Sequence, residues 1–257
     1  MARAFAAASS QYFVNANAIV AAEPLTMACW VKPNGITTNY AVMAIDTEGG
    51  TARWGLNFLG AGGGDPISAL STNTVGTSAQ SDVTGGTATW QHAAGVWAST
   101  TSRTAYRNGT AGTTNTTSIS VTGIDTTRIA ARYAGTLGAF LDGSVAEAAI
   151  WNVALTAAEI ASLAAGFCPL LVRPQSLVAY WPLFARATDE ESWVGAFPMT
   201  NTNTATAAQH PPRIIYPSWP RIIIPAAAGG TTVARLVNGG LVNGGTLIGG
   251  RLARMAA

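Results

Sequence analysis

Short apolar runs separated by turn residues dominate the first 185 residues of the chain. Residues 25–31 (LTMACWV) have the two-residue period of a strand, which places Leu25, Met27, Cys29 and Val31 on one face. A Pro-Asn-Gly sequence then predicts a turn. Short strands that follow one another with turns at close spacing are typical of an antiparallel sandwich.

The same pattern predicts further strands in residues 11–14, 40–45, 54–58, 89–97, 103–107, 126–133, 144–151 and 176–183. Asn108-Gly109 after the strand at 103–107 predicts a hairpin. Residues 59–88 are polar and Gly-rich, which predicts weak strands and a long loop. The glycine triplet at 62–64 lacks the following Gly-Lys-Ser/Thr of a phosphate-binding loop, so it indicates a loop without that chemistry.

One short helix is predicted after the strand at 144–151. Thr156 and Glu159 have the spacing of a capping box, and Leu155 and Ile160 that of a hydrophobic staple. Gly166 stands where a glycine commonly ends a helix. The expected fold is therefore all-β with one helix.

The character of the chain changes after residue 185, and we predict two parts, a sandwich at 1–185 and an extended arm at 186–257. Residues 200–206 have the composition of a polar linker, and the prolines of residues 210–225 (HPPRIIYPSWPRIIIP) argue against a central strand. LVNGG, LVNGG and TLIGG then repeat at 236–250, which predicts serial turns. Three such units cannot bury their apolar pairs alone, so we expect the arm to mediate assembly.

Aromatic and aliphatic residues of the extension are the predicted interface anchors. They are Trp193, Tyr216, Trp219, Ile222, Ile223, Ile224, Leu236, Val237, Leu241 and Val242. The tryptophans that fall in the predicted strands are instead expected in the core; they are Trp54, Trp90, Trp97, Trp151 and Trp181.

Composition narrows the classes of partner. Charged residues make up 10% of the chain, which suits a protein held in an assembly. The net charge of +2 gives no electrostatic footprint for nucleic acid. Lys32 is the single lysine beside thirteen arginines, a bias that either interface chemistry or genomic base composition explains.

Neither a leader nor a disulfide framework is expected. The N-terminal residues lack the apolar run of a secretion signal, and no run of about 20 apolar residues predicts a membrane span. Cys29 and Cys168 are expected as buried free thiols.

No catalytic set is recognised. The closest same-strand carboxylates, Asp142 and Glu147, are five residues apart, which does not suit a retaining glycosidase. His92 and His210 lack a recognisable nucleophile. We therefore predict that the protein is not an enzyme.

The sequence gives little support for a metal site. The His and Cys residues lack zinc spacing. Calcium is the ion for which loop carboxylates are available, at Asp46, Asp125 and Asp142, but Asp at turns is more commonly a turn former. No cofactor is predicted.

Four ordered motifs resemble the concanavalin A-like or laminin-G-like jelly roll over residues 4–183. They are LTMACWVKP, WQHAAGVW, AYRNGT and FLDGSVAEAAIWNVALTAAEIASL. The resemblance implies an antiparallel jelly-roll β-sandwich. Val145-Ala146-Glu147 departs from the family's Ile-Asp-Glu, and the departure removes an acidic position close to the family's metal or ligand rim.

From these features we expect a non-enzymatic structural protein of a viral particle, namely a bacteriophage capsid decoration or head-surface protein anchored through its arm. Its partners would be the major capsid or tail protein and further copies of itself, with a trimer as the specific expectation. It would be assembled in the host bacterial cytoplasm, without nucleic acid or membrane. The alternative is a lectin-like adhesion module of a tail or fibre that binds host-surface glycans.

Overall fold

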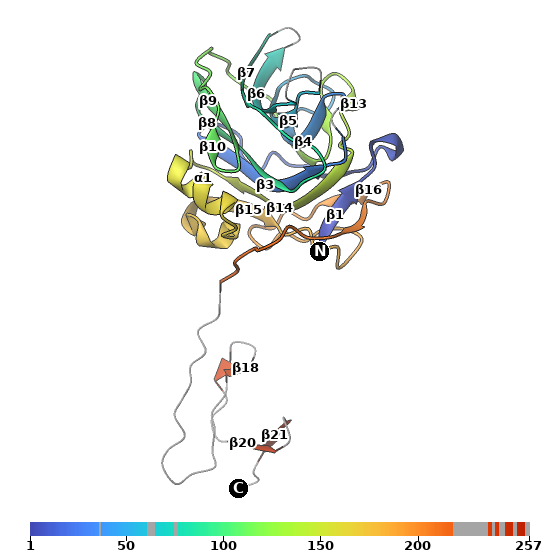
Figure 1. Cartoon of the computed structure of the whole chain (residues 1–257), viewed down its shortest axis with the longest axis vertical. Helices are drawn as coiled ribbons and strands as arrows, with labels where there is room; N and C mark the ends of the chain where they lie inside the picture. Colours follow the sequence, from blue (N-terminus) through green and yellow to red (C-terminus); the bar gives the residue numbers. More distant parts are fainter. Residues whose placement is uncertain are drawn as a thin grey trace. The chain divides into compact units, whose positions relative to one another are not determined.

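A computed structural model of the chain describes residues 1–35, 37–60, 65–74, 77–217, 236–237, 240–241, 245–248 and 251–254. The chain divides into two compact units, Met1–Tyr216 and Pro217–Ala257. Figure 1 shows the first unit as a β-sandwich with the helical segment α1 beside it.

The first unit consists mainly of strands. Its elements are β1 (Ala2–Phe5), η1 (Ala7–Ser9), β2 (Tyr12–Asn15), β3 (Leu25–Pro33), β4 (Tyr40–Asp46), β5 (Arg53–Phe58), β6 (Ile67–Thr74), β7 (Thr77–Val83), β8 (Gln91–Ser99), β9 (Ser102–Arg107), β10 (Thr110–Ala111), β11 (Thr126–Ile129), β12 (Arg132–Tyr133), β13 (Leu137–Gly138), β14 (Gly143–Trp151), α1 (Ala157–Ala164), η2 (Pro169–Leu171), η3 (Pro174–Ser176), β15 (Leu177–Trp181), β16 (Thr200–Thr202) and β17 (Thr206–Ala208).

Two antiparallel sheets form the sandwich. One has the strand order β10-β9-β8-β3-β14-β1-β17, with β15 also paired to β14, and will be called the eight-stranded sheet. The other, the seven-stranded sheet, has the order β16-β2-β11-β4-β5-β6-β7. A small hairpin of β12 and β13 accompanies them. This arrangement confirms the predicted jelly-roll sandwich with antiparallel sheets.

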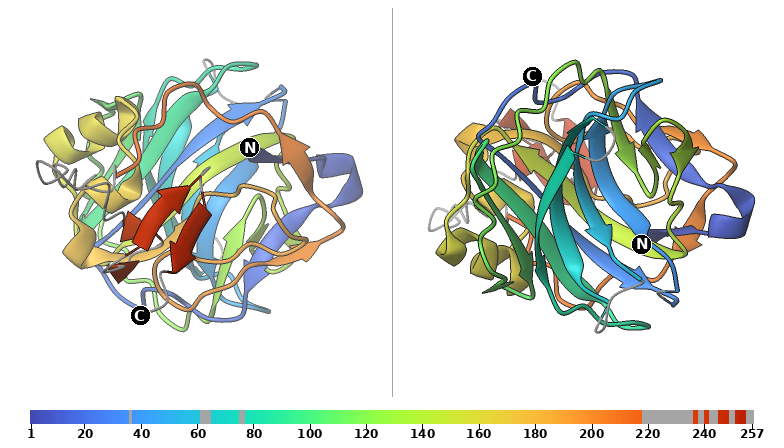
Figure 2. Two further views of the ribbon diagram at one scale, coloured as in Figure 1. Left: turned by 90° about the horizontal axis from the view of Figure 1, so that it is seen from below. Right: turned by 90° about the horizontal axis from the view of Figure 1, so that it is seen from above.

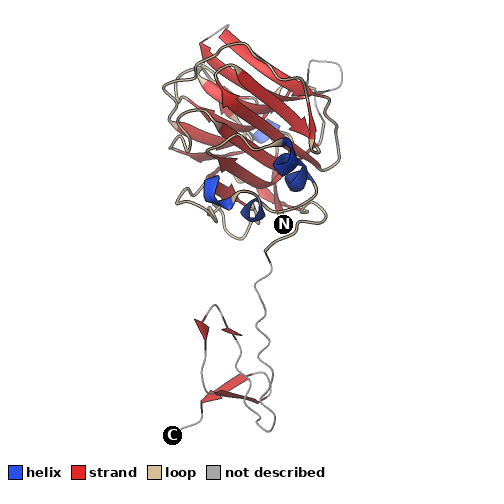
Figure 3. Cartoon of the chain, turned by 90° about the vertical axis from the view of Figure 1, so that its left-hand side faces the viewer, coloured by secondary structure: helices blue, strands red, loops and turns tan. Residues whose placement is uncertain are grey.

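Apolar side chains form two separate clusters, one on each face of the eight-stranded sheet. The larger lies between the sheets and includes Trp54, Trp97 and Trp181. The smaller lies on the outer face of the eight-stranded sheet, where Trp151 and residues of α1 pack together. Figure 3 shows the helical segments outside the stacked strands. Trp54, Trp97, Trp151 and Trp181 are fully buried, which confirms them as core residues, and Trp90 is partly buried just before β8.

The predicted helix signals are confirmed. Thr156 caps α1 and forms the complete capping box with Glu159. At the other end the amide of Gly166 donates to the Leu163 carbonyl, and that of Phe167 to the Ser162 carbonyl. Gly166 has φ +99°, so this is a Schellman motif with glycine in its usual place. Among the described residues no helix is long and apolar enough to cross a bilayer.

The sandwich continues past the predicted boundary at residue 185. β16 pairs with β2, and β17 pairs with β1. Figure 2 shows these orange strands beside the blue N-terminal strands. The predicted polar linker at 200–206 therefore supplies edge strands, and the compact unit ends at Tyr216.

Arg3 of β1 attaches the residues that follow position 185 to the sandwich. Its Nε donates to Glu190 Oε1 at 2.5 Å, and its Nη1 donates to the Ala205 carbonyl at 2.9 Å. Nη2 also donates to the Thr188 carbonyl at 3.0 Å. Both Arg3 and Glu190 are buried. Glu190 thus has its counter-charge in β1, at a residue 187 positions away.

Residues 59–88 also differ from expectation in part, because β6 and β7 are full members of the seven-stranded sheet. Their register pairs Ile67 with Val83 and Thr72 with Ser78. Both cysteines are buried and free, as predicted.

The second unit contains two hairpins within its described residues. β18 (Leu236–Val237) pairs with β19 (Gly240–Leu241), and β20 (Gly245–Ile248) pairs with β21 (Arg251–Arg254). β18 lies in the first copy of the repeat and pairs with Leu241, the first residue of the second copy, while residues 238–239 of the predicted turn lie outside the described residues.

Shortening the chain tests where the sandwich ends. A chain ending at Thr204 loses β17 and the carbonyl of Ala205 that Arg3 uses. We expect its free energy of unfolding to fall by about 3 kcal/mol or more, because buried hydrogen-bond partners are lost together. A chain ending at Tyr216 should retain the stability of the intact sandwich. Guanidinium denaturation followed by circular dichroism compares the two, and equal stability would show that the sandwich does not need the residues after Thr204.

Candidate functional site

Glu147 lies at an irregularity in the middle of β14. On one side of β14 the partner changes from β1, which ends its pairing at Val145, to β15, which begins at Ala148. On the other side the register with β3 shifts between Ala146 and Ala149. This is a β-bulge, and Glu147 adopts φ +55° within it. A left-handed conformation is costly for a residue with a Cβ, so surrounding contacts must hold it.

Three side-chain donors surround the Glu147 carboxylate. Tyr180 Oη donates to Oε2 at 2.5 Å, Tyr216 Oη donates to Oε1 at 2.6 Å, and His210 Nε2 lies 2.9 Å from Oε1. Glu147 is 3% exposed. Tyr180 comes from β15, whereas His210 and Tyr216 follow the last strand of the unit. The carboxylate therefore fastens the C-terminal residues of the unit to the eight-stranded sheet.

Aromatic rings extend this site to the surface. Trp193 packs edge-on against Tyr180 and Phe184, with ring centroids 5.8 and 5.4 Å apart. Phe184 also contacts His210 and Tyr216 at 5.6 and 6.0 Å. The five rings of Tyr180, Phe184, Trp193, His210 and Tyr216 will be called the aromatic centre. Its outer member, Trp193, is 47% exposed.

The phenols of the aromatic centre are hydrogen-bond donors rather than acids. Burial and then the Glu147 charge raise the pKa of Tyr180 well above its ordinary value. The same two causes raise the pKa of Tyr216. Both hydroxyls therefore keep their protons at neutral pH and remain donors to Glu147.

The structure brings two of the predicted interface anchors together, since Trp193 and Tyr216 lie 6.4 Å apart between ring centroids. Leu236 and Val237 form β18 and Leu241 belongs to β19, in the second unit. Trp219, Ile222, Ile223, Ile224 and Val242 lie outside the described residues.

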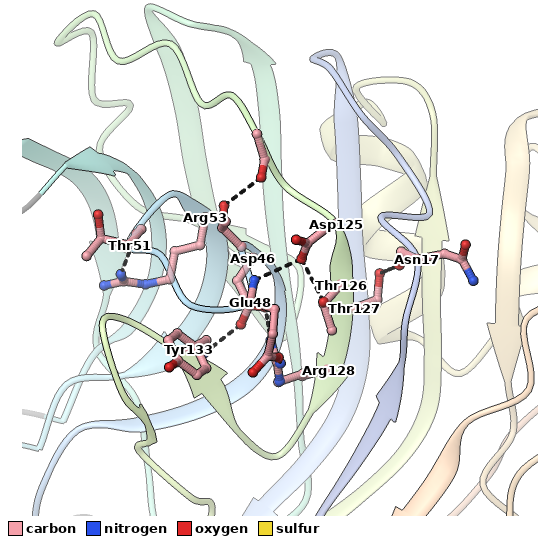
Figure 4. Close-up of polar contacts among 12 residues, drawn as sticks. Asn17, Asp46, Glu48, Thr51, Arg53, Asp125, Thr126, Thr127, Arg128 and Tyr133 are labelled. Carbon is pink, nitrogen blue, oxygen red and sulfur yellow. Dashed lines mark hydrogen bonds and ion pairs between the residues drawn. The ribbon is translucent and has the colours of Figure 1, made fainter.

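A second polar site lies on the outer face of the seven-stranded sheet (Figure 4). Arg128 on β11 contacts the carboxylates of Asp46 and Glu48, and the Tyr133 amide donates to Asp46 Oδ2 at 2.6 Å. Arg53 of β5 lies directly opposite Asp46 in the sheet. Together with Arg132 of β12, the residues Asp46, Glu48, Arg53 and Arg128 will be called the arginine cluster.

Burial shifts the titration of this cluster. It raises the pKa of Asp46 to about 6, although the Arg128 charge acts in the opposite direction. Burial, followed by the neighbouring charge of Arg132, lowers the pKa of Arg53 to about 10. The Arg132 pKa is also lowered by burial. The arginines remain charged at neutral pH but are poorly hydrated.

The predicted calcium carboxylates are occupied by protein donors. Asp46 is bound by Arg128, and Asp125 Oδ1 accepts from the Glu48 amide and the Thr126 hydroxyl at 2.8 and 2.7 Å. Asp142 accepts from the Asn34 amide group at 3.1 Å. Within the described ranges no three His, Cys, Asp or Glu residues are grouped as a metal site would need.

His92 takes no part in either site. It is 2% exposed on β8, beside the Trp30 ring at 5.7 Å. Burial lowers its pKa to about 3, so the imidazole is neutral at physiological pH.

Sequence reasoning missed the pairing of Glu147 with His210 and the arginine cluster. A glutamate inside the apolar run GSVAEAAIW was a usable signal, since a buried carboxylate demands donors. The identity of those donors was not readable, because His210 and Tyr216 are more than sixty positions away.

The geometry thus defines an antiparallel jelly-roll sandwich with a cluster of polar side chains on each of its two sheets. Residues 7–161 match the sequence model of the concanavalin A-like lectin/glucanases superfamily, and the chain belongs to that family. No curated protein matches the chain.

Solved structures share the fold at low sequence identity. A putative carbohydrate-binding protein from Bacteroides ovatus is 18% identical with a TM-score of 0.56, covering 80% of this chain and 61% of that one. This chain therefore spans less than two thirds of that protein. The CBM40 of the Ruminococcus gnavus IT-sialidase, bound to α2,3-sialyllactose, is 15% identical, with a TM-score of 0.48 and coverage of 56% and 84%. Domain 4 of the Geobacillus stearothermophilus arabinanase AbnA, in complex with arabinotriose, is 18% identical, with a TM-score of 0.47 and coverage of 58% and 69%.

Substitution of Glu147 tests how much the aromatic centre depends on it. Glu147→Ala removes the acceptor of Tyr180, Tyr216 and His210 at once. We expect the free energy of unfolding to fall by about 2–4 kcal/mol, because buried donors lose their partner. Chemical denaturation measures the change, with the exposed Glu191→Ala as a charge-matched control that should stay within about 0.5 kcal/mol. Equal effects of the two substitutions would contradict this role.

Proposed function

We propose that this protein is a non-catalytic, lectin-like module that binds carbohydrate through the aromatic centre. The observation that carries the proposal is the exposed indole of Trp193, held in one orientation by Tyr180 and Phe184. A sugar presents an apolar ring face and a polar rim of hydroxyls. A fixed aromatic surface with a few polar groups beside it suits both parts of such a ligand.

The fold supports this function. Membership of the concanavalin A-like lectin/glucanases superfamily covers most of the sandwich. The Bacteroides ovatus protein with the same fold is described as a putative carbohydrate-binding protein. These likenesses favour the lectin-like alternative over a purely structural role.

The state of the carboxylates favours binding over hydrolysis. A glycosidase needs one carboxyl group free to give a proton and a second free to attack or activate water. Here Glu147 is held by two phenols and an imidazole, Asp46 by Arg128, and Glu190 by Arg3. Each of these buried carboxylates is already committed to a structural contact.

Truncation of Trp193 tests the proposal. On an array of bacterial-surface and plant glycans, the glycan bound most tightly by the full chain should lose about tenfold or more in affinity with Trp193→Ala, since an aromatic anchor supplies much of the energy of such a site. Phe167→Ala is the matched control, because Phe167 is 41% exposed but lies outside the aromatic centre. Binding that survives Trp193→Ala unchanged would contradict the proposed platform.

We also propose that residues 217–257 act as an assembly arm, as in a decoration protein of a bacteriophage particle. Large apolar side chains are exposed near the end of the first unit. In the described part of the chain Phe167, Leu171 and Ile215 are each 41–46% exposed, and the backbones of Phe167 and Ile215 pair. A contiguous apolar patch is typical of an interface with another protein.

Light scattering after gel filtration tests the assembly role. The full chain is expected to be oligomeric, and a chain ending at Tyr216 is expected to be a folded monomer. Monomers of both chains would remove the support for assembly through the arm while leaving the carbohydrate proposal intact.

A further inference from the structure

Polar side chains form a row across one end of the seven-stranded sheet, on its outer face. Thr126, Asp46, Arg53 and Thr72 occupy directly paired positions on β11, β4, β5 and β6. Their chain neighbours Ile45 and Trp54 point into the core, so these four side chains point outward. The β12–β13 hairpin lies over this row, because the Tyr133 amide donates to Asp46.

Two polar groups in this row have no hydrogen-bond partner among the described residues. Arg53 Nη1 donates to the Thr51 carbonyl at 3.0 Å, but the buried Arg53 Nε has no partner. Thr72 is 5% exposed, and its buried Oγ1 has no partner in the described part of the chain. Figure 4 shows the Arg53 side chain directed toward Thr51 and away from the Asp46 carboxylate. A buried donor without an acceptor is costly and calls for an explanation.

The nearby carboxylates are engaged by other donors. Both Asp46 oxygens are taken, one by Arg128 and the other by the Tyr133 amide, and Glu48 also binds Arg128. Asp125 is exposed and accepts from a backbone amide and a hydroxyl. Arg132 of β12 precedes Tyr133, whose amide bonds Asp46 opposite Arg53, and it brings a second guanidinium to this end of the sheet. Within the described structure, the Nε of Arg53 and the Oγ1 of Thr72 are therefore left without a hydrogen-bond partner beside these engaged carboxylates.

We propose that Arg53, Arg132 and Thr72 bind the carboxylate of an acidic saccharide, of the uronic acid class. A carboxylate offers two coplanar oxygens that match the guanidinium fork, and the Thr72 hydroxyl supplies a further donor. The saccharide part of this ligand rests on the lectin-like function proposed above. The anionic part rests on the geometry of the row and is independent of Trp193, which lies beyond the other sheet.

Nuclear magnetic resonance of the full chain tests the site directly, because the Nε–H signals of arginine report on their hydrogen-bond acceptor. Sodium glucuronate, sodium acetate and glucose are titrated separately at constant ionic strength. We expect glucuronate to shift the Arg53 and Arg132 signals at lower concentration than acetate, and glucose to leave them unchanged. Arg53→Gln and Arg132→Gln should each weaken glucuronate binding about tenfold or more. Arg213→Gln, which removes an exposed arginine elsewhere, should not.

Thr72→Val separates a ligand site from a merely structural hydroxyl. The substitution removes the unpartnered oxygen, so the ligand-free protein should melt at a higher temperature. The same substitution should weaken glucuronate binding several-fold. A change in melting temperature with unaltered affinity would exclude Thr72 from the site.

Two results would overturn the inference and identify which part failed. Glucuronate that shifts neither arginine, while the glycan array still shows binding that depends on Trp193, would refute the anion site and leave the proposed function standing. Equal affinity for acetate and glucuronate, together with an array that shows no binding at all, would refute the saccharide assignment and the proposed function with it.

Discussion

The buried carboxylate of Glu147 determines how the C-terminal residues of the first unit pack on the eight-stranded sheet. It is buried at a bulge of β14, in a left-handed backbone conformation, where the strand exchanges β1 for β15 as its partner. A buried charge is tolerated only with several donors, and here these come from β15 and from the end of the first unit. A local irregularity in one strand thereby fixes the path of residues more than sixty positions away and orients the rings around Trp193.

The two sheets consequently carry different chemistry on their outer faces. The eight-stranded sheet presents rings held by hydrogen bonds to one carboxylate, with an exposed indole at the edge. On the seven-stranded sheet, Arg53 and Arg132 lie beside two carboxylates that both contact Arg128. Arg3 of β1 attaches residues 187–205 to the eight-stranded sheet, because its guanidinium donates to backbone carbonyls of that segment. The ion pair of Arg3 with Glu190 thus adds to the pairing of β16 with β2 and of β17 with β1 in holding this segment on the sandwich.

How much of the fold the sequence could predict depends on how far apart in the chain the interacting residues lie. The cap formed by Thr156 and Glu159, the Gly166 stop and the alternating run at Leu25 are local, and each is confirmed. β16 and β17 are polar segments whose strand character comes only from pairing with β2 and β1, so composition indicated a linker. The bulge at Glu147 was equally hidden, because GSVAEAAIW has the pattern of one continuous buried strand.

The claim that Glu147 holds the end of the first unit in place is tested most directly by hydrogen exchange of the full chain, measured by mass spectrometry. The amide of Ile215 donates to the Gly166 carbonyl, and that of Cys168 donates to the Ile215 carbonyl, so both report on this attachment. In Glu147→Ala we predict rapid exchange of these amides while those of β3 stay protected. Unchanged protection of Ile215 and Cys168 in the variant would contradict the account.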